Sequence, residues 1–323
     1  MKIQANDGIS QAGKSALEDA GFTVITDKVA QEDLIAYINK ENIEAVLVRS
    51  ATTVRQDIID ACPGLKLIGR GGVGMDNIDV SYARTKGIEV INTPAASSQS
   101  VAELVMAHLF SMVRGVYDAN RQMPLRGEAE FAVLKKKYAK GIELRGKTLG
   151  IVGIGRIGQS LASYALGCGM KVISADLVPG NKEIPVDIQG YGEILVNIPV
   201  RSLEDILPQC DFISLHVPKQ PDGTPVIGKK QIDAMKDGVI LVNAARGGSI
   251  DEDALIEGLD SGKLAAVGLD VFENEPQPRK DILNHPKISL TPHIGAATLE
   301  AQDRIGLELA HKIVSLFGET INN

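Results

Sequence analysis

The chain has 323 residues, enough for two domains, and its 44% hydrophobic and 23% charged residues are typical of a folded globular protein. Its formal net charge of −7 at pH 7 disfavours a nucleic-acid-binding surface, because phosphate backbones require clustered positive charge. The three widely spaced cysteines indicate neither a metal site nor a disulfide framework. No apolar stretch has the length of a membrane span, and the first twenty residues lack a signal-peptide pattern. We therefore expect a cytoplasmic protein without metal, nucleic-acid or membrane partners.

The first ninety or so residues alternate between helical and strand patterns. Helical spacing covers residues 10–21, 31–40 and 55–62, and short apolar runs predict strands over 22–25, 44–48 and 65–68. Two of these strands lead into Arg49-Ser50 and Arg70. Ligands of parallel α/β sheets bind at the carboxyl ends of strands, so this part predicts a small α/β unit with a binding edge of its own.

A hinge and a long apolar helix follow. The strand pattern of residues 88–91 runs into Asn92-Thr-Pro94 and the small polar stretch 95–100, which is typical of a hinge. Residues 101–117 then predict one long helix with more than one apolar face. Such a helix lies either deep in a core or in a subunit interface.

A glycine-rich turn follows the apolar run 148–152. The sequence Gly153-Ile-Gly155-Arg-Ile-Gly158 alone is a weak signal, but here it lies between a strand pattern and a helical pattern. Gly153 permits the tight turn, Gly155 lets the backbone approach a pyrophosphate, and Gly158 allows close packing of helix and strand. Asp176 ends the next apolar run, 18 positions after Gly158, where an acid can accept hydrogen bonds from ribose hydroxyls. Its carboxylate would repel a 2′-phosphate, so we expect NAD rather than NADP.

Further strands are predicted at 212–216, 239–243 and 266–270, with a possible hairpin at 184–198 and a final helix at 298–313. Four polar residues stand at or soon after these strand ends, namely Arg246, Asp270, Glu275 and His293. A guanidinium can bind a substrate carboxylate, an imidazole can exchange a proton near neutral pH, and a neighbouring carboxylate can orient that imidazole. Taken singly, each residue is more readily a surface charge or a satisfied core residue, and the spacing of the four together leaves both interpretations open.

Several motifs together resemble the D-isomer-specific 2-hydroxyacid dehydrogenases over nearly the whole chain. The matching stretches are Gly153-x-Gly-x-x-Gly158 with Asp176, His216-Val-Pro218, Leu241-Val-Asn-Ala-Ala-Arg-Gly-Gly248, Gly268-Leu-Asp-Val-Phe-Glu-Asn-Glu-Pro276 and Thr291-Pro-His-Ile-Gly295. The resemblance implies an α/β fold with a Rossmann NAD-binding domain over 96–295 and a smaller flavodoxin-like α/β substrate-binding domain formed by 1–95 and 296–323. It also implies a homodimer formed through residues 101–138.

The resemblance assigns roles residue by residue. Arg246 would bind the carboxylate and carbonyl oxygen of a 2-keto acid, His293 would be the acid/base, and Glu275 would pair with His293. Glu273 is not chosen, because the family's glutamate directly precedes the proline. The implied cofactor-binding residues for NAD are Gly153, Gly155, Arg156, Ile157, Gly158, Asp176, His216, Val217, Pro218, Ala244, Asp270 and Gly295.

Residues 70–79 and 291–298 are most similar to the 3-phosphoglycerate dehydrogenases within this family. The substrate-binding residues would then be Arg49, Ser50, Arg70, Val73 and Gly74. The implied reaction is the NAD-dependent oxidation of 3-phospho-D-glycerate, a phosphorylated 2-hydroxy acid, as in the first step of serine biosynthesis. The two arginines could instead pair with local carboxylates, leaving the Val73 and Gly74 amides to hold a substrate. The alternatives are a glyoxylate or hydroxypyruvate reductase, another D-2-hydroxyacid dehydrogenase and, from another class, an NADH-sensing corepressor.

Overall fold

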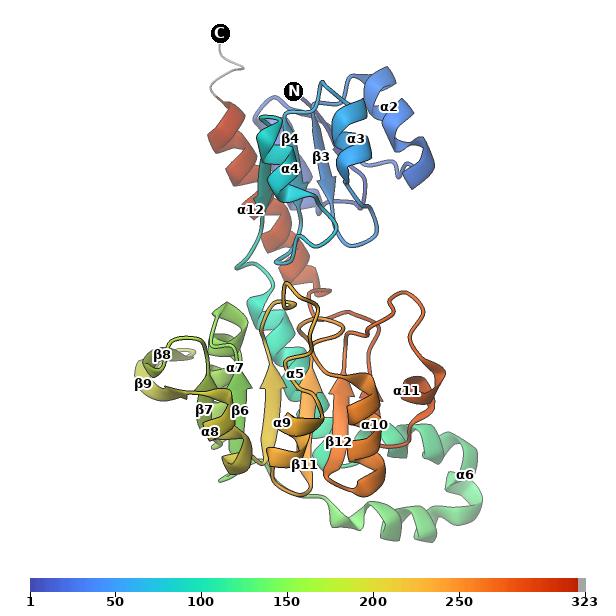
Figure 1. The fold of residues 1–323 in the computed structure, drawn as a ribbon, viewed down its shortest axis with the longest axis vertical. Helices are drawn as coiled ribbons and strands as arrows, with labels where there is room; N and C mark the ends of the chain where they lie inside the picture. The colour runs from blue at the N-terminus through green and yellow to red at the C-terminus, as the bar shows by residue number, and fades with distance from the viewer. Residues whose placement is uncertain (319–323) are drawn as a thin grey trace. The chain divides into compact units, whose positions relative to one another are not determined.

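The computed structural model describes residues 1–318, which divide into two compact α/β units (Figure 1). The N-terminal unit comprises Met1–Ser98 and the chain from Ala296 onward, and the central unit comprises Gln99–Gly295. The boundaries predicted from the sequence were 95/96 and 295/296. No helix in residues 1–318 is long and apolar enough to cross a membrane.

The N-terminal unit is built on a five-stranded parallel sheet. Its strands are β1 (Lys2–Ala5), β2 (Thr23–Ile25), β3 (Ala45–Val48), β4 (Leu67–Arg70) and β5 (Glu89–Asn92). Their spatial order is β2-β1-β3-β4-β5, and every neighbouring pair is parallel. This 2-1-3-4-5 order is that of the flavodoxin-like fold, as predicted.

Helices cover both faces of this sheet. On one face, α2 (Leu34–Glu41), α3 (Gln56–Ala61) and α4 (Val80–Thr85) contribute to one apolar cluster. A 3₁₀ turn at Gln31–Asp33 precedes α2. On the other face, α1 (Gln11–Asp19) and α12 (Leu299–Phe317) share a second cluster. These two helices touch through glycines, because a Cβ on Gly13 would lie 2.6 Å from the backbone of Gly306. The last segment of the chain thus completes the core of the first.

The central unit is built on an eight-stranded sheet in the order β13-β12-β11-β10-β6-β7-β9-β8. The strands are β6 (Thr148–Val152), β7 (Lys171–Ala175), β8 (Gly180–Ile188), β9 (Gly192–Arg201), β10 (Phe212–Leu215), β11 (Val239–Asn243), β12 (Leu264–Leu269) and β13 (Ile288–Leu290). All neighbouring pairs are parallel except β8 with β9. The strand order reverses direction between β6 and β10, which is the point where doubly wound sheets bind dinucleotides.

Two apolar layers hold helices against this sheet. One layer contains residues of α5 (Ser98–Val113) and α7 (Arg156–Gly167). The other contains residues of α8 (Leu203–Ile206), α9 (Lys229–Ala234), α10 (Glu252–Ser261) and α11 (Lys280–Asn284). Short 3₁₀ turns lie at Tyr138–Lys140 and Leu207–Gln209. The central unit therefore has the helix-sheet-helix layering of a Rossmann domain.

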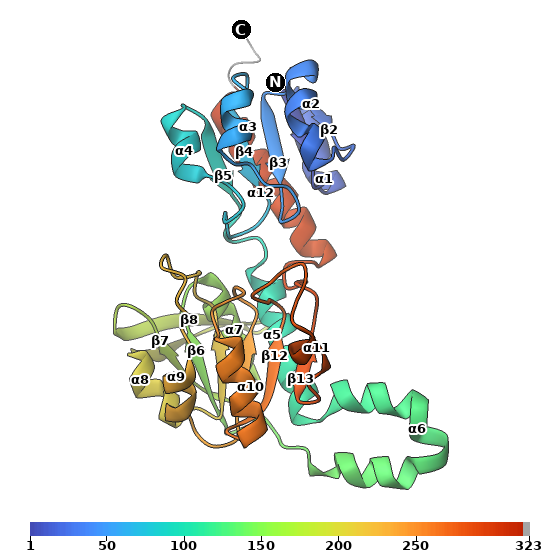
Figure 2. The ribbon, with the colours of Figure 1, turned by 45° about the vertical axis from the view of Figure 1, so that its right-hand side comes forward.

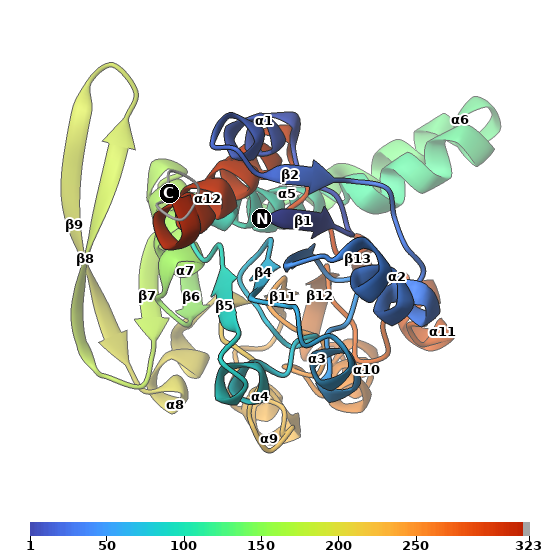
Figure 3. The same ribbon diagram turned by 90° about the horizontal axis from the view of Figure 1, so that it is seen from above.

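Two segments differ from the sequence prediction. The single helix expected over 101–117 is wrong at its end, because α5 stops at Val113 and Gly115 takes a left-handed conformation (φ 62°) before α6 (Val116–Lys137) begins. Helix α6 contains Pro124 and a non-helical residue at Glu130, and it stands away from the sheet of its unit (Figure 2). The predicted hairpin is confirmed but is longer than 184–198, since β8 and β9 pair from Gly180–Val200 to Ile188–Gly192 and extend from the sheet edge (Figure 3).

Candidate active site

The glycine turn after β6 has the shape that a dinucleotide requires. Gly153 adopts φ 96°, and a Cβ there would lie 2.8 Å from the carbonyl oxygen of His216. A Cβ on Gly158 would lie 2.2 Å from the carbonyl oxygen of Gly153. In contrast, a Cβ on Gly155 would have no atom of residues 1–318 within 4 Å apart from those of its immediate chain neighbours. Gly153 and Gly158 therefore permit close packing, whereas Gly155 borders an open space at the start of α7, where backbone amides favour a pyrophosphate.

Asp176 joins the end of β7 to this turn. One carboxylate oxygen accepts a hydrogen bond from the Ile154 amide at 2.9 Å, and the other accepts from the Leu177 amide at 2.7 Å. Leu177 and Val178, which follow, are highly exposed apolar residues, so neither offers a positive charge to a 2′-phosphate. At the other side of the turn, Arg156 is exposed and Ile157 half-buried in the first turn of α7.

His216 lies at the carboxyl end of β10, across from the glycine turn. Its Nε2 is 2.9 Å from the Ser214 hydroxyl, and burial lowers the pKa of His216 to about 3, so the ring is neutral. Its buried Nδ1 has no hydrogen-bond partner in residues 1–318. Val217 and Pro218 continue this edge, and buried Ala244 follows the neighbouring strand β11. These residues fit NAD at the point where the strand order reverses.

Arg246 stands two residues beyond Ala244. The Asn243 side chain fixes this loop by accepting from the Ala245 amide at 3.0 Å and donating to the Arg246 carbonyl at 2.9 Å. The Arg246 guanidinium donates to the Ala245 carbonyl at 2.6 Å. Its positive charge acts on both Glu275 and His293, where it lowers the pKa of each group. The central unit thus brings together the three residues predicted to be catalytic.

His293 and Glu275 form the closest pair in this set. His293 Nδ1 lies 2.7 Å from Glu275 Oε2, and the Phe272 amide donates to Glu275 Oε1 at 2.9 Å. The hydrogen bond to Glu275 raises the pKa of His293, against the opposing effect of burial. Burial alone would raise the pKa of Glu275, but the hydrogen bonds from His293 and Phe272 hold it below its ordinary value. An ionised carboxylate accepts only, so Nδ1 donates and Nε2 remains available to a substrate.

Glu273 has a different environment from Glu275. Its Oε1 accepts from the Glu252 amide at 3.3 Å, and its own amide donates to Glu252 Oε1 at 3.0 Å. Of these two carboxylates, Glu275 is therefore the one in contact with His293.

Asp270 is buried and holds the loop that carries His293. Asp270 Oδ1 accepts from the Thr291 hydroxyl at 2.7 Å and from the Ile294 amide at 2.8 Å, and Oδ2 accepts from the Gly295 amide at 2.9 Å. The role in NAD binding that the family resemblance implies for Asp270 stays a prediction. The loop function of Asp270, and of Gly295 as its donor, was not anticipated from the sequence.

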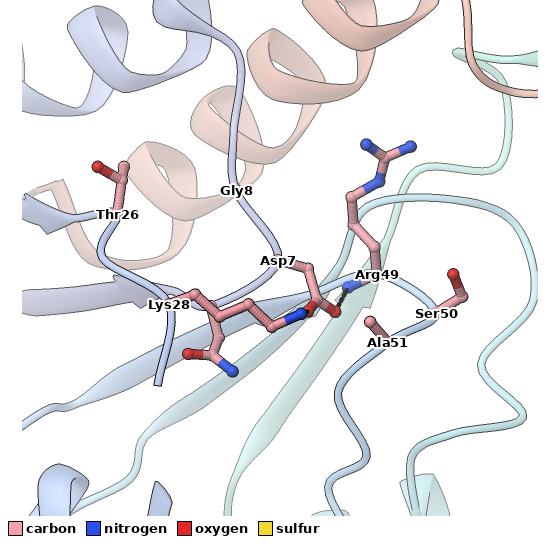
Figure 4. Close-up of a pocket in the computed structure, with 8 residues that line it drawn as sticks. Asp7, Gly8, Thr26, Lys28, Arg49, Ser50 and Ala51 are labelled. Carbon is pink, nitrogen blue, oxygen red and sulfur yellow. Dashed lines mark hydrogen bonds and ion pairs between the residues drawn. The ribbon is translucent and has the colours of Figure 1, made fainter. Parts of the chain in front are cut away.

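The N-terminal unit contains the predicted substrate residues. Arg49 and Ser50 line a pocket of about 320 Å³ together with Asn6, Asp7, Gly8, Thr26, Lys28 and Ala51 (Figure 4). Asp7 organises the pocket floor, since its nearly buried carboxylate accepts from the amides of Arg49 (2.7 Å) and Thr52 (3.0 Å). Lys28 Nζ lies 3.8 Å from the same carboxylate. The pocket therefore combines two cationic side chains with a hydroxyl.

The Arg49 guanidinium points away from Asp7 (Figure 4), and in residues 1–318 it makes no hydrogen bond or ion pair. Burial lowers the pKa of Arg49, and the nearby Asp7 charge partly opposes this effect. For Arg49, pairing with a local carboxylate is therefore not observed. The Asn77 side chain supports the loop by donating to the carbonyls of Arg49 (2.7 Å) and Thr52 (2.6 Å).

Arg70, Val73 and Gly74 lie on the loop after β4. The Arg70 side chain folds over Gly72, which adopts φ 147°, and a Cβ at this position would displace the Arg70 guanidinium. The Val73 side chain is exposed, and its carbonyl accepts from Asn92 at 2.7 Å. Lys28 and Asp7 were missed from the sequence. Both follow sheet strands, but β1 was not predicted, and without it their common edge is not visible.

Comparison with known proteins agrees with this geometry. The sequence profile described as "D-isomer specific 2-hydroxyacid dehydrogenase, NAD binding domain" matches residues 106–295. A hydroxypyruvate reductase of Thermotoga maritima is 42% identical over 320 residues, covering 98% of both chains. A D-3-phosphoglycerate dehydrogenase of Methanocaldococcus jannaschii is 40% identical over 325 residues, covering 100% of this chain and 59% of that protein. This chain thus spans little more than half of that relative.

The fold is shared with solved structures as well. The crystal structure of a glyoxylate reductase from Paecilomyes thermophila matches with a TM-score of 0.81 and 30% sequence identity, covering 98% of this chain and 94% of that one. From its sequence, its NAD-binding fold and these similarities, the chain belongs to the D-isomer specific 2-hydroxyacid dehydrogenases and is an NAD-dependent oxidoreductase of that family.

Proposed function

We propose that the enzyme oxidises 3-phospho-D-glycerate to 3-phosphohydroxypyruvate, with NAD as the oxidant. The observation that carries this proposal is the pocket containing Arg49, Lys28 and Ser50, in which the Arg49 guanidinium has no carboxylate partner in residues 1–318. A guanidinium, an ammonium and a hydroxyl together suit the doubly charged phosphate of this substrate. Arg70, with the amides of Val73 and Gly74, completes the proposed phosphate-binding set.

The chemistry at C2 is assigned to the central unit. His293 Nε2 takes the proton of the C2 hydroxyl, and Glu275 stabilises the resulting imidazolium through the hydrogen bond at Nδ1. Arg246 binds the substrate carboxylate and stabilises the carbonyl oxygen as it forms. The glycine turn and Asp176 would hold NAD, which would supply the hydride acceptor for the oxidation at C2. Reduction follows the same path in reverse, with protonated His293 as the acid.

Reduction of hydroxypyruvate is the second candidate. It is favoured by the Thermotoga maritima relative, which matches this chain over nearly the whole length of both. The two reactions need the same residues at C2 and differ in the phosphate. Substrates that differ only in that group therefore separate the two candidates.

The test compares the reduction of 3-phosphohydroxypyruvate and hydroxypyruvate by wild type and by Arg49→Gln. Loss of a charge-assisted contact costs about 1.5–3 kcal/mol, so kcat/KM for the phosphorylated acid should fall about 10- to 100-fold. That for hydroxypyruvate should change less than about threefold. Arg55→Gln is the matched control, because Arg55 is half-exposed and pairs with Asp79 outside the pocket. Equal losses on both substrates would contradict the phosphate assignment.

We also propose a homodimer formed through α5 and α6. Large apolar side chains on these helices are exposed, namely Phe110, Val116, Met123, Leu125, Phe131 and Val133. Leu125 is 80% exposed, and a stable monomer rarely displays such a run of apolar residues. Light scattering after size exclusion should give a dimer for wild type and for Ile194→Glu on β9, and a monomer for Leu125→Glu. A wild-type monomer would refute this proposal.

A further inference from the structure

One buried histidine has no place in the chemistry proposed above. His108 lies in α5 and is 3% exposed, yet both ring nitrogens have polar partners. Its Nδ1 is 2.9 Å from the Ser289 hydroxyl, and its Nε2 is 3.0 Å from the Thr291 hydroxyl. Gly268 makes room for the ring, because a Cβ there would lie 3.1 Å from His108 Cβ and Cγ. An apolar helix thus places a polar group against the start of the loop that carries His293.

Ser289, His108, Thr291 and Asp270 form a series of hydrogen bonds, and the direction of each bond follows from the Asp270 carboxylate, which only accepts. The Thr291 hydroxyl donates its only proton to Asp270 Oδ1 at 2.7 Å. It must therefore accept from His108, which requires the proton to be on Nε2. Nδ1 is then an acceptor and receives the proton of Ser289. Burial lowers the pKa of His108, which is consistent with this neutral form.

The last hydrogen bonds of this series are made by the backbone on the C-terminal side of His293. Asp270 Oδ1 also accepts from the Ile294 amide, and Oδ2 accepts from the Gly295 amide. His293 itself has φ 55°, a left-handed conformation that residues with a side chain rarely adopt. Such a conformation persists only where the surroundings enforce it. Fixed points on both sides of His293, at Thr291 and at Ile294-Gly295, supply that enforcement.

We propose that His108 is a positioning residue for the reaction, acting through Thr291 and Asp270 to hold the 291–295 loop in the conformation that presents His293 to the substrate. The inference rests on the proposed acid/base role of His293. Without the Nε2 donor, the Thr291 hydroxyl loses the group from which it accepts a hydrogen bond, and its orientation toward Asp270 is no longer fixed.

The test uses His108→Leu, which fills the site without a polar atom, and His108→Gln, which can place an N–H near the position of Nε2. Met112→Leu is the matched control, because Met112 packs beside the same Gly268. In His108→Leu, we expect kcat to fall about tenfold, as for loss of one buried hydrogen bond. The KM for the hydroxy acid and the KM for NAD should each stay within about twofold of wild type. His108→Gln should recover kcat to within about threefold, and Met112→Leu should match wild type.

Hydrogen–deuterium exchange supplies a readout that does not depend on activity. The Ile294 and Gly295 amides should exchange about tenfold faster in His108→Leu than in wild type, while strands β6 and β11 should be unchanged. Unchanged exchange at these two amides would overturn the inference, even if activity fell. Faster exchange with unchanged kcat would also overturn it, because the link would then have no catalytic effect.

A double-mutant cycle tests the route through Thr291. If His108 acts through that hydroxyl, His108→Leu should have no further effect on kcat or exchange in a Thr291→Val background. Additive losses would refute the route. His293→Ala separates the two proposals: if it retains activity, the role of His293 fails, whereas the exchange result still decides whether His108 holds the loop.

Discussion

The pairing of Glu275 with His293 gives a prediction in two parts, a loss of rate and a movement of the pH profile. Glu275→Gln keeps the size of the side chain and removes its charge. A charge-assisted hydrogen bond contributes about 1.5–3 kcal/mol. Because the two side chains are 35% and 43% exposed, water weakens their interaction, and we expect a value near the lower end. A loss of about 1.5 kcal/mol corresponds to about a tenfold lower kcat/KM.

The direction of the pH effect follows from the role of His293. The hydrogen bond to Glu275 raises the pKa of His293, so Glu275→Gln should lower that pKa. Oxidation needs the neutral imidazole, so its rate falls as the pH drops through the pKa of His293. In the variant this acidic limb should move to lower pH. Reduction needs the imidazolium, so the limb in which its rate falls with rising pH should also move to lower pH.

The assay is NADH absorbance in both directions across the pH range, with kcat/KM fitted at each point. Glu273→Gln is the control, because Glu273 exchanges hydrogen bonds with Glu252 rather than with His293. It should leave both limbs in place. Limbs that do not move in Glu275→Gln, or that move equally in Glu273→Gln, would refute the assigned pairing.

Four further substitutions test the cofactor site and the phosphate pocket. Gly155→Ala should leave Tm within about 2 °C of wild type but weaken NAD binding about tenfold or more, since its Cβ would occupy the space expected for the pyrophosphate. Gly158→Ala should instead destabilise the fold by about 1–3 kcal/mol, because its Cβ would clash with Gly153. Thermal unfolding and NAD titration distinguish the two glycine variants. Equal changes of Tm and of NAD affinity in both variants would contradict these separate roles. Lys28→Met should raise the KM for the phosphorylated acid about tenfold in steady-state assays and leave the KM for hydroxypyruvate unchanged. An unchanged KM for the phosphorylated acid would exclude Lys28 from phosphate binding. Asp176→Asn should lower the preference for NAD over NADP about tenfold in kcat/KM, and a constant ratio would show that Asp176 does not set it.

Most of the fold could be predicted because buried strands and helix faces repeat with a fixed period. The strand-turn-helix at Gly153–Gly158 could be predicted from the glycine spacing between a strand pattern and a helical pattern, and Gly153 and Gly158 each meet a local steric requirement. Strand β1 was missed because four residues, Lys2–Ala5, give too short a pattern, and half of them are polar. The end of α5 was missed because its apolar pattern runs on to Val116, whereas the chain turns at Gly115. Helix α6 carries many exposed apolar residues, so periodicity could not separate it from a buried helix.

The residues of the candidate site also fall into two groups, those that the sequence could predict and those that depend on the folded structure. Arg246, Glu275 and His293 could be proposed from the sequence because they stand in recognisable motifs near strand ends. His108 could not, because its partners Ser289 and Thr291 are 181 and 183 residues away and the contact depends on helix packing. Asp7 and Lys28 were missed for a similar reason, since they reach Arg49 through strand order rather than through neighbouring positions.

Oxidation of 3-phospho-D-glycerate is best tested by measuring NADH formation with this acid beside D-glycerate, and NADH consumption with 3-phosphohydroxypyruvate beside hydroxypyruvate and glyoxylate. We predict a kcat/KM at least about 10- to 100-fold higher for each phosphorylated acid than for its unphosphorylated counterpart, lost in Arg49→Gln. Equal or better use of the unphosphorylated acids would contradict phosphoglycerate oxidation and favour a hydroxypyruvate or glyoxylate reductase.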